Sequence, residues 1–330
     1  MGRDCRVWYI ESVATSPSTR IDRLIADMRA GKRLALARLI SKVENRDSDL
    51  HEVMRGIYAL SGNAEVWGIT GPPGAGKSTM VDQLAAKLRK FGKRVAIVAV
   101  DPSSPFSGGA ILGDRIRMQR HTSDDGVFIR SLGTRGKHGG LSHATKEVVL
   151  VLDAAKFDVI LVETAGVGQT ELDVLKLAQT VIVTLVPESG DSIQVMKAGL
   201  MEIADVFAVN KADRPEADKL VKELVTMVGM NDHDASSWII PVLKTEAVRD
   251  VGVDELLAAV GKHQAWLTTS GHRDEKGRRF LKEEVSDILV ERLEKSLAGA
   301  FETSSGKDLL EQLLRREIDP YSAADLISGT

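Results

Sequence analysis

Residues 66–79 read Val-Trp-Gly-Ile-Thr-Gly-Pro-Pro-Gly-Ala-Gly-Lys-Ser-Thr, and this stretch decides the fold. A short apolar strand runs into a glycine-rich loop with the spacing Gly71-x-x-x-x-Gly76-Lys77-Ser78, and a helical pattern follows. This is the P-loop motif in the strand–loop–helix context that the motif requires. Its glycines let successive backbone N–H groups turn toward phosphate oxygens at a helix N-terminus. The stretch therefore predicts a nucleoside triphosphate site.

Two side chains of this loop carry the expected phosphate and metal chemistry. Lys77 supplies a point charge at the β- and γ-phosphates, and the Ser78 hydroxyl is placed to ligate Mg²⁺. The predicted nucleotide-binding residues of the loop are Gly71, Pro72, Pro73, Gly74, Ala75, Gly76, Lys77, Ser78 and Thr79.

The composition is that of an ordinary globular protein. The chain has 330 residues, of which 43% are hydrophobic and 28% charged, and its net charge is −3. No basic field points to nucleic acid or to an anionic membrane. The single cysteine, Cys5, excludes an internal disulfide and fits a reducing compartment. The longest apolar runs have the length of strands and no secretory signal is evident, so we expect a cytoplasmic protein without a membrane span.

Apolar runs alternate with helical patterns between residues 63 and 268, the expected P-loop domain. Because the runs are apolar throughout, they predict a doubly wound, mostly parallel sheet of the α/β class with helices on both faces. The expected strands are 66–70, 94–100, 127–129, 158–163, 180–186, 206–210 and 238–242. The expected helices between them include 79–91, 144–155 and 217–228.

Three further segments flank this core. We expect a flexible leader at 1–18, a helical region at 19–62 that Gly31 divides into two helices, and a helical extension at 269–330. The extension contains a charge-rich helical pattern with an apolar stripe at Leu281, Val285, Ile288, Leu289, Leu293 and Leu297. Such a stripe must pack against something, either its own domain or a second subunit.

A second motif, Asn210-Lys211-Ala212-Asp213, directly follows the expected strand 206–210. Loops at the carboxyl ends of parallel strands face the ligand crevice. There, the Asp213 carboxylate can accept hydrogen bonds from guanine N1–H and from its 2-amino group. Adenine offers neither donor, so the motif predicts GTP rather than ATP. The next such loop contains Thr245, Glu246 and Ala247, which either complete the base pocket through the backbone or merely connect two elements.

Acidic residues at two further strand ends are candidate Mg²⁺ ligands. Asp101 and Glu163 each follow an apolar strand, and Asp114 lies in the glycine-rich segment between them. With Ser78 they form the expected metal set, since Mg²⁺ prefers a hydroxyl and one or two carboxylates. The expected catalytic residues are Lys77, Glu163 and Gly166, whose amide can approach the γ-phosphate. Val167 follows Gly166 and cannot orient a water as a glutamine does, so we expect slow GTP hydrolysis until a partner completes the site.

These motifs together resemble those of the methylmalonyl-CoA mutase-associated GTPases, from about residue 20 onward. The resemblance is carried by Gly71-Pro72-Pro73-Gly74-Ala75-Gly76-Lys77-Ser78-Thr79, Val100-Asp101-Pro102-Ser103-Ser104, Gly108-Gly109-x-Ile111-Leu112-Gly113-Asp114-Arg115, Glu163-Thr164-Ala165-Gly166-Val167-Gly168-Gln169, Gly190-Asp191-x-x-Gln194 and Asn210-Lys211-Ala212-Asp213. Lys244-Thr245-Glu246 departs from the commonest form of the fifth guanine loop.

The resemblance implies a function, a partner and an assembly. It implies a GTPase chaperone that gates adenosylcobalamin delivery to, and protects or reactivates, a cobalamin-dependent acyl-CoA mutase, and a homodimer held partly by the C-terminal helices. It also implies that nucleotide state is coupled to the mutase through a switch, for which the candidate residues are Gln169, Asp191, Gln194 and Lys197.

Two other functions stay open at this point. A P-loop kinase would use the same loop, but Asn210-Lys211-x-Asp213 disfavours ATP. A GTPase that delivers metal to nickel enzymes would need cysteine and histidine clusters for a borderline metal, and this chain has one cysteine.

Overall fold

The computed structural model describes residues 20–101, 119–121, 123–133, 140–166, 175–187, 200–230 and 237–328. The chain divides into two compact units, Met1–Ser270 and Gly271–Thr330. None of the helices in the described ranges is both long enough and apolar enough to cross a membrane.

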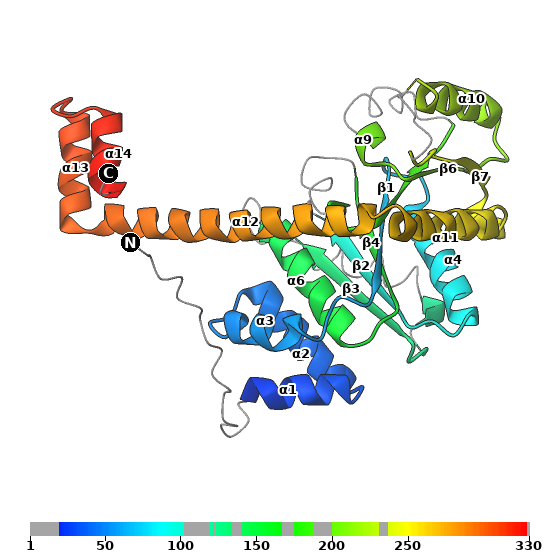
Figure 1. The fold of residues 1–330 in the computed structure, drawn as a ribbon, viewed down its shortest axis with the longest axis horizontal. Coiled ribbons are helices and arrows are strands. Elements are labelled where there is room, and N and C mark those ends of the chain that lie inside the picture. Colours follow the sequence, from blue (N-terminus) through cyan, green and yellow to red (C-terminus); the bar gives the residue numbers. More distant parts are fainter. Residues whose placement is uncertain are drawn as a thin grey trace, which may run out of the picture. The chain divides into compact units, whose positions relative to one another are not determined.

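The first unit is built on a seven-stranded sheet with the strand order β3-β2-β4-β1-β5-β6-β7 (Figure 1). Every pair of neighbouring strands is parallel. The strands are β1 (Glu65–Thr70), β2 (Val95–Asp101), β3 (Val127–Gly133), β4 (Val159–Thr164), β5 (Thr180–Leu185), β6 (Val206–Asn210) and β7 (Val242–Thr245). The predicted α/β class with a doubly wound sheet is confirmed.

Each face of the sheet has its own hydrophobic core, because successive side chains of a strand point to opposite faces. On β2, Val95 and Ile97 belong to one core and Ala96 and Val98 to the other. The first core is completed by α4 (Lys77–Lys90) and α11 (Val253–Thr269). The helices α6 (Gly140–Ala154) and α10 (Ala217–Val228) contribute to the second. Both faces are therefore covered, which explains why the strands read as continuous apolar runs.

The predicted position of the last strand is wrong. Residues 238–241 form no strand, and β7 begins at Val242, opposite Phe207 of β6. Pro241 has no N–H group for a sheet ladder, although its carbonyl still accepts from the Phe207 amide (2.9 Å). Trp238 instead donates its indole N–H to the Asp205 carbonyl (2.8 Å). Consequently Thr245, expected in a loop, is the last residue of the strand.

Three N-terminal helices join the second core: α1 (Arg20–Arg29), α2 (Arg33–Asn45) and α3 (Leu50–Tyr58). The predicted helix break at Gly31 is confirmed. This glycine has a φ of 85°, a backbone angle that residues other than glycine rarely adopt. Arg33 donates to the Val127 carbonyl (2.5 Å), and Arg130 pairs with Glu44. These contacts attach α2 to the edge strand β3.

Asp153 of α6 holds the connection between α3 and β1. Its buried carboxylate accepts hydrogen bonds from the amides of Gly62 (2.5 Å), Asn63 (3.1 Å) and Ala64 (3.1 Å). We expect Asp153→Ala to lower the free energy of unfolding by about 2–4 kcal/mol, because the amides lose their acceptor. Urea unfolding measures the change. The control is Asp125→Ala, whose carboxylate is 97% exposed; an equal loss in both variants would contradict the assignment.

The second unit contains α12 (His272–Glu302), α13 (Ser304–Leu314) and α14 (Pro320–Ser328). Thr303 caps α13 by accepting from the Gly306 amide (3.1 Å). Asp319 caps α14 by accepting from the amides of Tyr321 (2.9 Å) and Ser322 (3.1 Å), so Pro320 stands at the first helical position. The hydrogen bond from the Ser322 hydroxyl lowers the pKa of Asp319 below its ordinary value. α12 buries none of its residues.

Candidate functional site

The P-loop connects the central strand β1 to the N-terminus of α4. Gly71 has a φ of 145°, and a Cβ there would lie 1.9 Å from the carbonyl oxygen of Thr184. Gly76 has a φ of 87°, and its Cβ would lie 2.3 Å from Asn210 Nδ2. Both positions therefore exclude any side chain. The backbone of the P-loop therefore packs directly against Thr184 of β5 and Asn210 of β6.

Lys77 is buried at the start of α4, and its ammonium group joins two loops. It donates to the carbonyls of Gly71 (2.8 Å) and Pro72 (3.0 Å) in the P-loop. It also donates to the carbonyl of Ala165 (3.2 Å), just past the end of β4. A positive charge is thus held where the P-loop and the loop after β4 meet.

Ser78 and Glu163 form a hydroxyl–carboxylate pair beside this lysine. The Ser78 hydroxyl donates to Oε1 of Glu163 at 2.6 Å, and Glu163 is buried in β4 near its carboxyl end. Both are hard oxygen donors of the kind that Mg²⁺ prefers. Gly166 follows at the same edge, and its carbonyl accepts from the hydroxyls of Thr70 (3.0 Å) and Thr164 (3.0 Å).

The other predicted metal ligands cannot be compared with this pair. Asp101 ends β2 beside β4, but its side chain lies outside the described residues, as does Asp114. The predicted switch residues Gln169, Asp191, Gln194 and Lys197 lie outside them too. Among the residues that the structure describes, no group of three or more histidine, cysteine or acidic side chains could hold a metal ion.

Asn210 connects three loops at the carboxyl edge of the sheet. Its buried side chain donates from Nδ2 to the Ala75 carbonyl of the P-loop (2.8 Å) and accepts at Oδ1 from the Ala247 amide (3.0 Å). Lys211 adds a hydrogen bond to the Gly74 carbonyl (2.9 Å). The phosphate loop and the two predicted base loops therefore form one connected surface.

Asp213 lies on this surface next to an arginine that sequence reasoning missed. Its carboxylate is 43% exposed, and Oδ2 lies 3.7 Å from Nη2 of Arg249. Arg249 also donates from Nη1 to Glu246 (2.8 Å). The sequence signal was only that Arg249 stands two residues after Ala247, in a loop at the same edge of the sheet.

Lys87 is a second residue that sequence reasoning missed. It is buried near the end of α4 and pairs with Asp254 (2.7 Å) and Asp250 (3.0 Å). Its hydrogen bond to Asp254, followed by that to Asp250, raises the pKa of Lys87 above its ordinary value. The P-loop helix is thereby attached at its far end to the loop that contains Arg249.

A cavity of about 430 Å³ opens at the P-loop. It is lined by Pro73, Gly74, Gly76, Lys77, Ser78, Thr79, Ala99, Glu163, Ala165 and Lys211. The predicted phosphate and metal residues Lys77, Ser78 and Glu163 thus share one cavity with Lys211 of the base loop.

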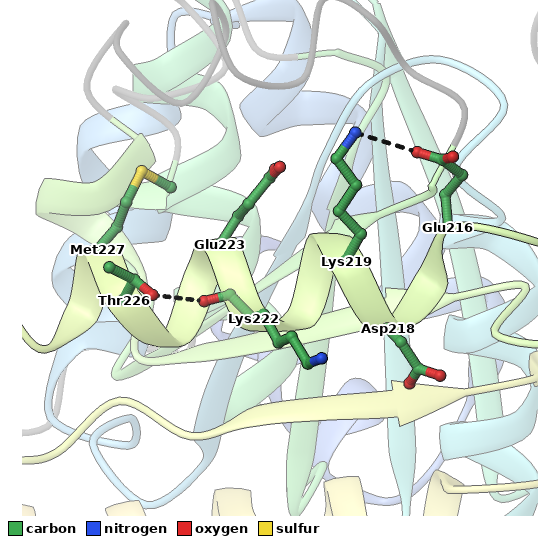
Figure 2. A pocket seen from close by; sticks show the side chains of 7 residues that line it. All are labelled: Glu216, Asp218, Lys219, Lys222, Glu223, Thr226 and Met227. Carbon is green, nitrogen blue, oxygen red and sulfur yellow. Dashed lines mark hydrogen bonds and ion pairs between the residues drawn. The ribbon is translucent and has the colours of Figure 1, made fainter.

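A larger hollow of about 710 Å³ lies along α10 (Figure 2). Figure 2 shows Lys219 and Glu223 directed to one side of the helix and Asp218 and Lys222 to the other. Lys219 pairs with Glu216 (3.3 Å), and Asp218 pairs with Lys244 of β7. Three of its charged lining residues are thus paired, whereas the P-loop cavity gathers the predicted phosphate and metal residues, so the P-loop cavity is the candidate site.

Comparison with known proteins agrees with this geometry. The family model described as methylmalonyl Co-A mutase-associated GTPase MeaB matches residues 36–302. A protein of Pyrococcus abyssi, provisionally named a GTPase, is 49% identical over 93% of this chain and 95% of its own length. The GTPase ArgK of Escherichia coli is 33% identical over 82% of this chain and 85% of its own.

Two further similarities cover nearly the whole chain. A mouse protein named methylmalonic aciduria type A homolog, mitochondrial, is 29% identical over 97% of this chain and 81% of its own length. The crystal structure of an LAO/AO transport system kinase superposes with a TM-score of 0.68 at 25% identity, covering 95% of this chain and 99% of that one. With a P-loop site on an all-parallel sheet and a family match over most of its length, the chain is a P-loop GTPase that belongs to the methylmalonyl Co-A mutase-associated GTPase MeaB family.

Proposed function

We propose that this GTPase is a chaperone of a cobalamin-dependent acyl-CoA mutase, gating adenosylcobalamin delivery to it and protecting or reactivating it. The family is named for association with methylmalonyl-CoA mutase, and the mouse relative is named for methylmalonic aciduria. The observation that carries the GTP-dependent part is the double hydrogen bonding of Asn210, which joins the P-loop to the loop of Ala247.

The nucleotide would lie across the P-loop, the loop after β6 and the loop after β7. The P-loop amides and Lys77 would hold the phosphates, and Asp213 would accept from the guanine N1–H and 2-amino groups. Thr245, Glu246 and Ala247 border the same pocket. Ser78 and Glu163 fit Mg²⁺ by their donor chemistry, with Asp101 and Asp114 as further ligands; a bound Mg²⁺ would neutralise charge on the β- and γ-phosphates.

Residues of the P-loop and of the loop after β4 supply charge and position, but Val167 cannot orient a water molecule as a glutamine does. Lys77 and the amide of Gly166 would stabilise negative charge on the γ-phosphate, whereas Val167 has an apolar side chain. We therefore propose slow turnover in the free protein and acceleration when the mutase or dimerisation completes the site. The predicted switch residues Gln169, Asp191, Gln194 and Lys197 would connect nucleotide state to that partner.

The apolar stripe of α12 supports a homodimer. Val285 (57% exposed), Leu289 (58%) and Leu293 (59%) recur at four-residue spacing, and none of them is buried. A second copy offers an identical stripe, so the two can bury each other. Light scattering after gel filtration should report twice the chain mass, and Leu289→Asp should shift the protein toward monomer. A monomeric unmodified protein would refute the dimer.

An ATP-dependent kinase is the second candidate, favoured by the name of the similar crystal structure, LAO/AO transport system kinase. The two functions differ in the nucleotide consumed. Asp213 favours guanine, so we expect GTP to be consumed. A preference for ATP would instead support the kinase function.

The decisive experiment measures phosphate release by the purified protein from GTP or ATP, alone and with a cobalamin-dependent acyl-CoA mutase from the same organism. We expect slow, GTP-specific turnover that rises when the mutase is added. Unchanged turnover together with no complex on gel filtration would overturn the mutase partnership while leaving the GTPase intact.

A further inference from the structure

The loop after β7 is closed by a backbone pair and contains a short 3-10 helix, Ala247–Arg249, that ends at Arg249. Glu246 and Val251 pair through both backbone groups, with N–O distances of 2.9 and 3.3 Å. Between them Asp250 adopts a φ of 60°, and Gly252 follows with a φ of 75°. A Cβ at Gly252 would lie 2.1 Å from the Lys244 carbonyl, so the turn is packed tightly on β7. Lys87 of α4 forms an ion pair with Asp250 of the turn.

Five backbone N–H groups between Glu246 and Val251 are already engaged within the protein. The Ala247 amide donates to Asn210 (3.0 Å), and the Arg249 amide donates to the Glu246 carbonyl (2.9 Å). The amides of Glu246 and Val251 donate to each other's carbonyls. Recognition of a base by any of these amides would break an existing hydrogen bond. A side-chain donor on the same turn would break none of them.

Arg249 is that donor. Its guanidinium spans from Glu246 (2.8 Å) toward Asp213 (3.7 Å), the carboxylate predicted to read the guanine N1–H and 2-amino groups. The contact with Asp213 is long, and the two side chains are 66% and 43% exposed. Such a pair contributes little to stability and is readily rearranged when a ligand enters.

We propose that Arg249 is a specificity-determining residue of the base pocket and donates a hydrogen bond to guanine O6; this rests on the proposed GTP binding. On the guanine edge, O6 is adjacent to the N1–H group from which Asp213 would accept a hydrogen bond. A guanidinium has donors and no acceptor, so it suits O6. Adenine carries a 6-amino donor at that position, which would face the guanidinium donors, and its N1 is an acceptor that would face the Asp213 carboxylate. Arg249 and Asp213 thus discriminate against adenine from two sides.

The test compares nucleotide affinities of three variants by isothermal titration calorimetry in the presence of Mg²⁺. The probes are GDP, IDP, which lacks the 2-amino group, 6-thio-GDP, whose sulfur is a weak acceptor, and ADP. The variants are Arg249→Ala, Arg249→Lys and, as a matched control, Lys219→Ala, whose exposed ammonium pairs within α10.

For Arg249→Ala we expect the GDP affinity to fall on the order of tenfold, as for the loss of one charge-assisted hydrogen bond. The gap between GDP and 6-thio-GDP should close, while the gap between GDP and IDP, which reports on Asp213, should remain. Arg249→Lys keeps a donor and should retain part of the affinity. Lys219→Ala should bind all four nucleotides as the unmodified protein does.

Three results would overturn the proposal, and they are distinguishable. Unchanged GDP affinity in Arg249→Ala removes the role of Arg249. Loss of the GDP–IDP gap with an intact 6-thio-GDP gap shows that Arg249 acts only through Asp213. An unmodified protein that binds ADP as tightly as GDP refutes the proposed GTP specificity itself, and with it this role.

Discussion

Replacing Lys77 with alanine is expected to lower the rate of GTP hydrolysis by at least about 100-fold, the effect of removing one charge that stabilises a transition state. The ammonium is held by the carbonyls of Gly71, Pro72 and Ala165, where the P-loop meets the loop after β4. Phosphate release at saturating GTP measures the change.

The matched control is Lys90→Ala, because Lys90 is an exposed lysine at the other end of the same helix. It should hydrolyse GTP at the unmodified rate. The thermal midpoint of Lys77→Ala should be determined alongside, since this lysine also joins two loops. A folded Lys77→Ala protein that keeps most of its turnover would refute the assigned phosphate role.

The parts of the fold that sequence could predict are those with local causes. The path of the P-loop depends on glycines, because its positive φ angles and close contacts leave no room for a side chain. The strands depend on apolar runs that are buried on both faces of the sheet. The final strand was misplaced because 238–242 is as apolar as a strand; its backbone path depends on Pro241 and on the contact of Trp238 with Asp205, far away in sequence.

The candidate site shows the same division. Lys77, Ser78, Glu163, Asn210 and Asp213 stand at motif positions, so their types and spacing predicted their roles. Arg249 and Lys87 carry no motif. Their importance comes from pairing across loops and helices that only the folded chain brings together. Local sequence patterns contain no signal for such pairs, and charged residues on a helix usually face solvent.

Asp213→Asn is expected to weaken GDP binding on the order of 100-fold and to strengthen binding of xanthosine diphosphate. The carboxylate can accept from both the N1–H and the 2-amino group of guanine, whereas an asparagine amide offers one acceptor and donors. Xanthine carries an oxygen acceptor in place of the 2-amino group, so it matches the amide. Calorimetric titration of both nucleotides tests the reversal.

The sign of the two changes is what identifies a base-reading carboxylate. Asp218→Asn is the control, because Asp218 of α10 is also exposed but pairs with Lys244 of the strand β7; it should leave both affinities unchanged. If Asp213→Asn weakened GDP and xanthosine diphosphate equally, the carboxylate would act only through general charge. A gain for xanthosine diphosphate in Asp213→Asn, with no gain in Asp218→Asn, supports a direct hydrogen bond between residue 213 and the edge of the base, because the control removes the same charge at a carboxylate that pairs with Lys244.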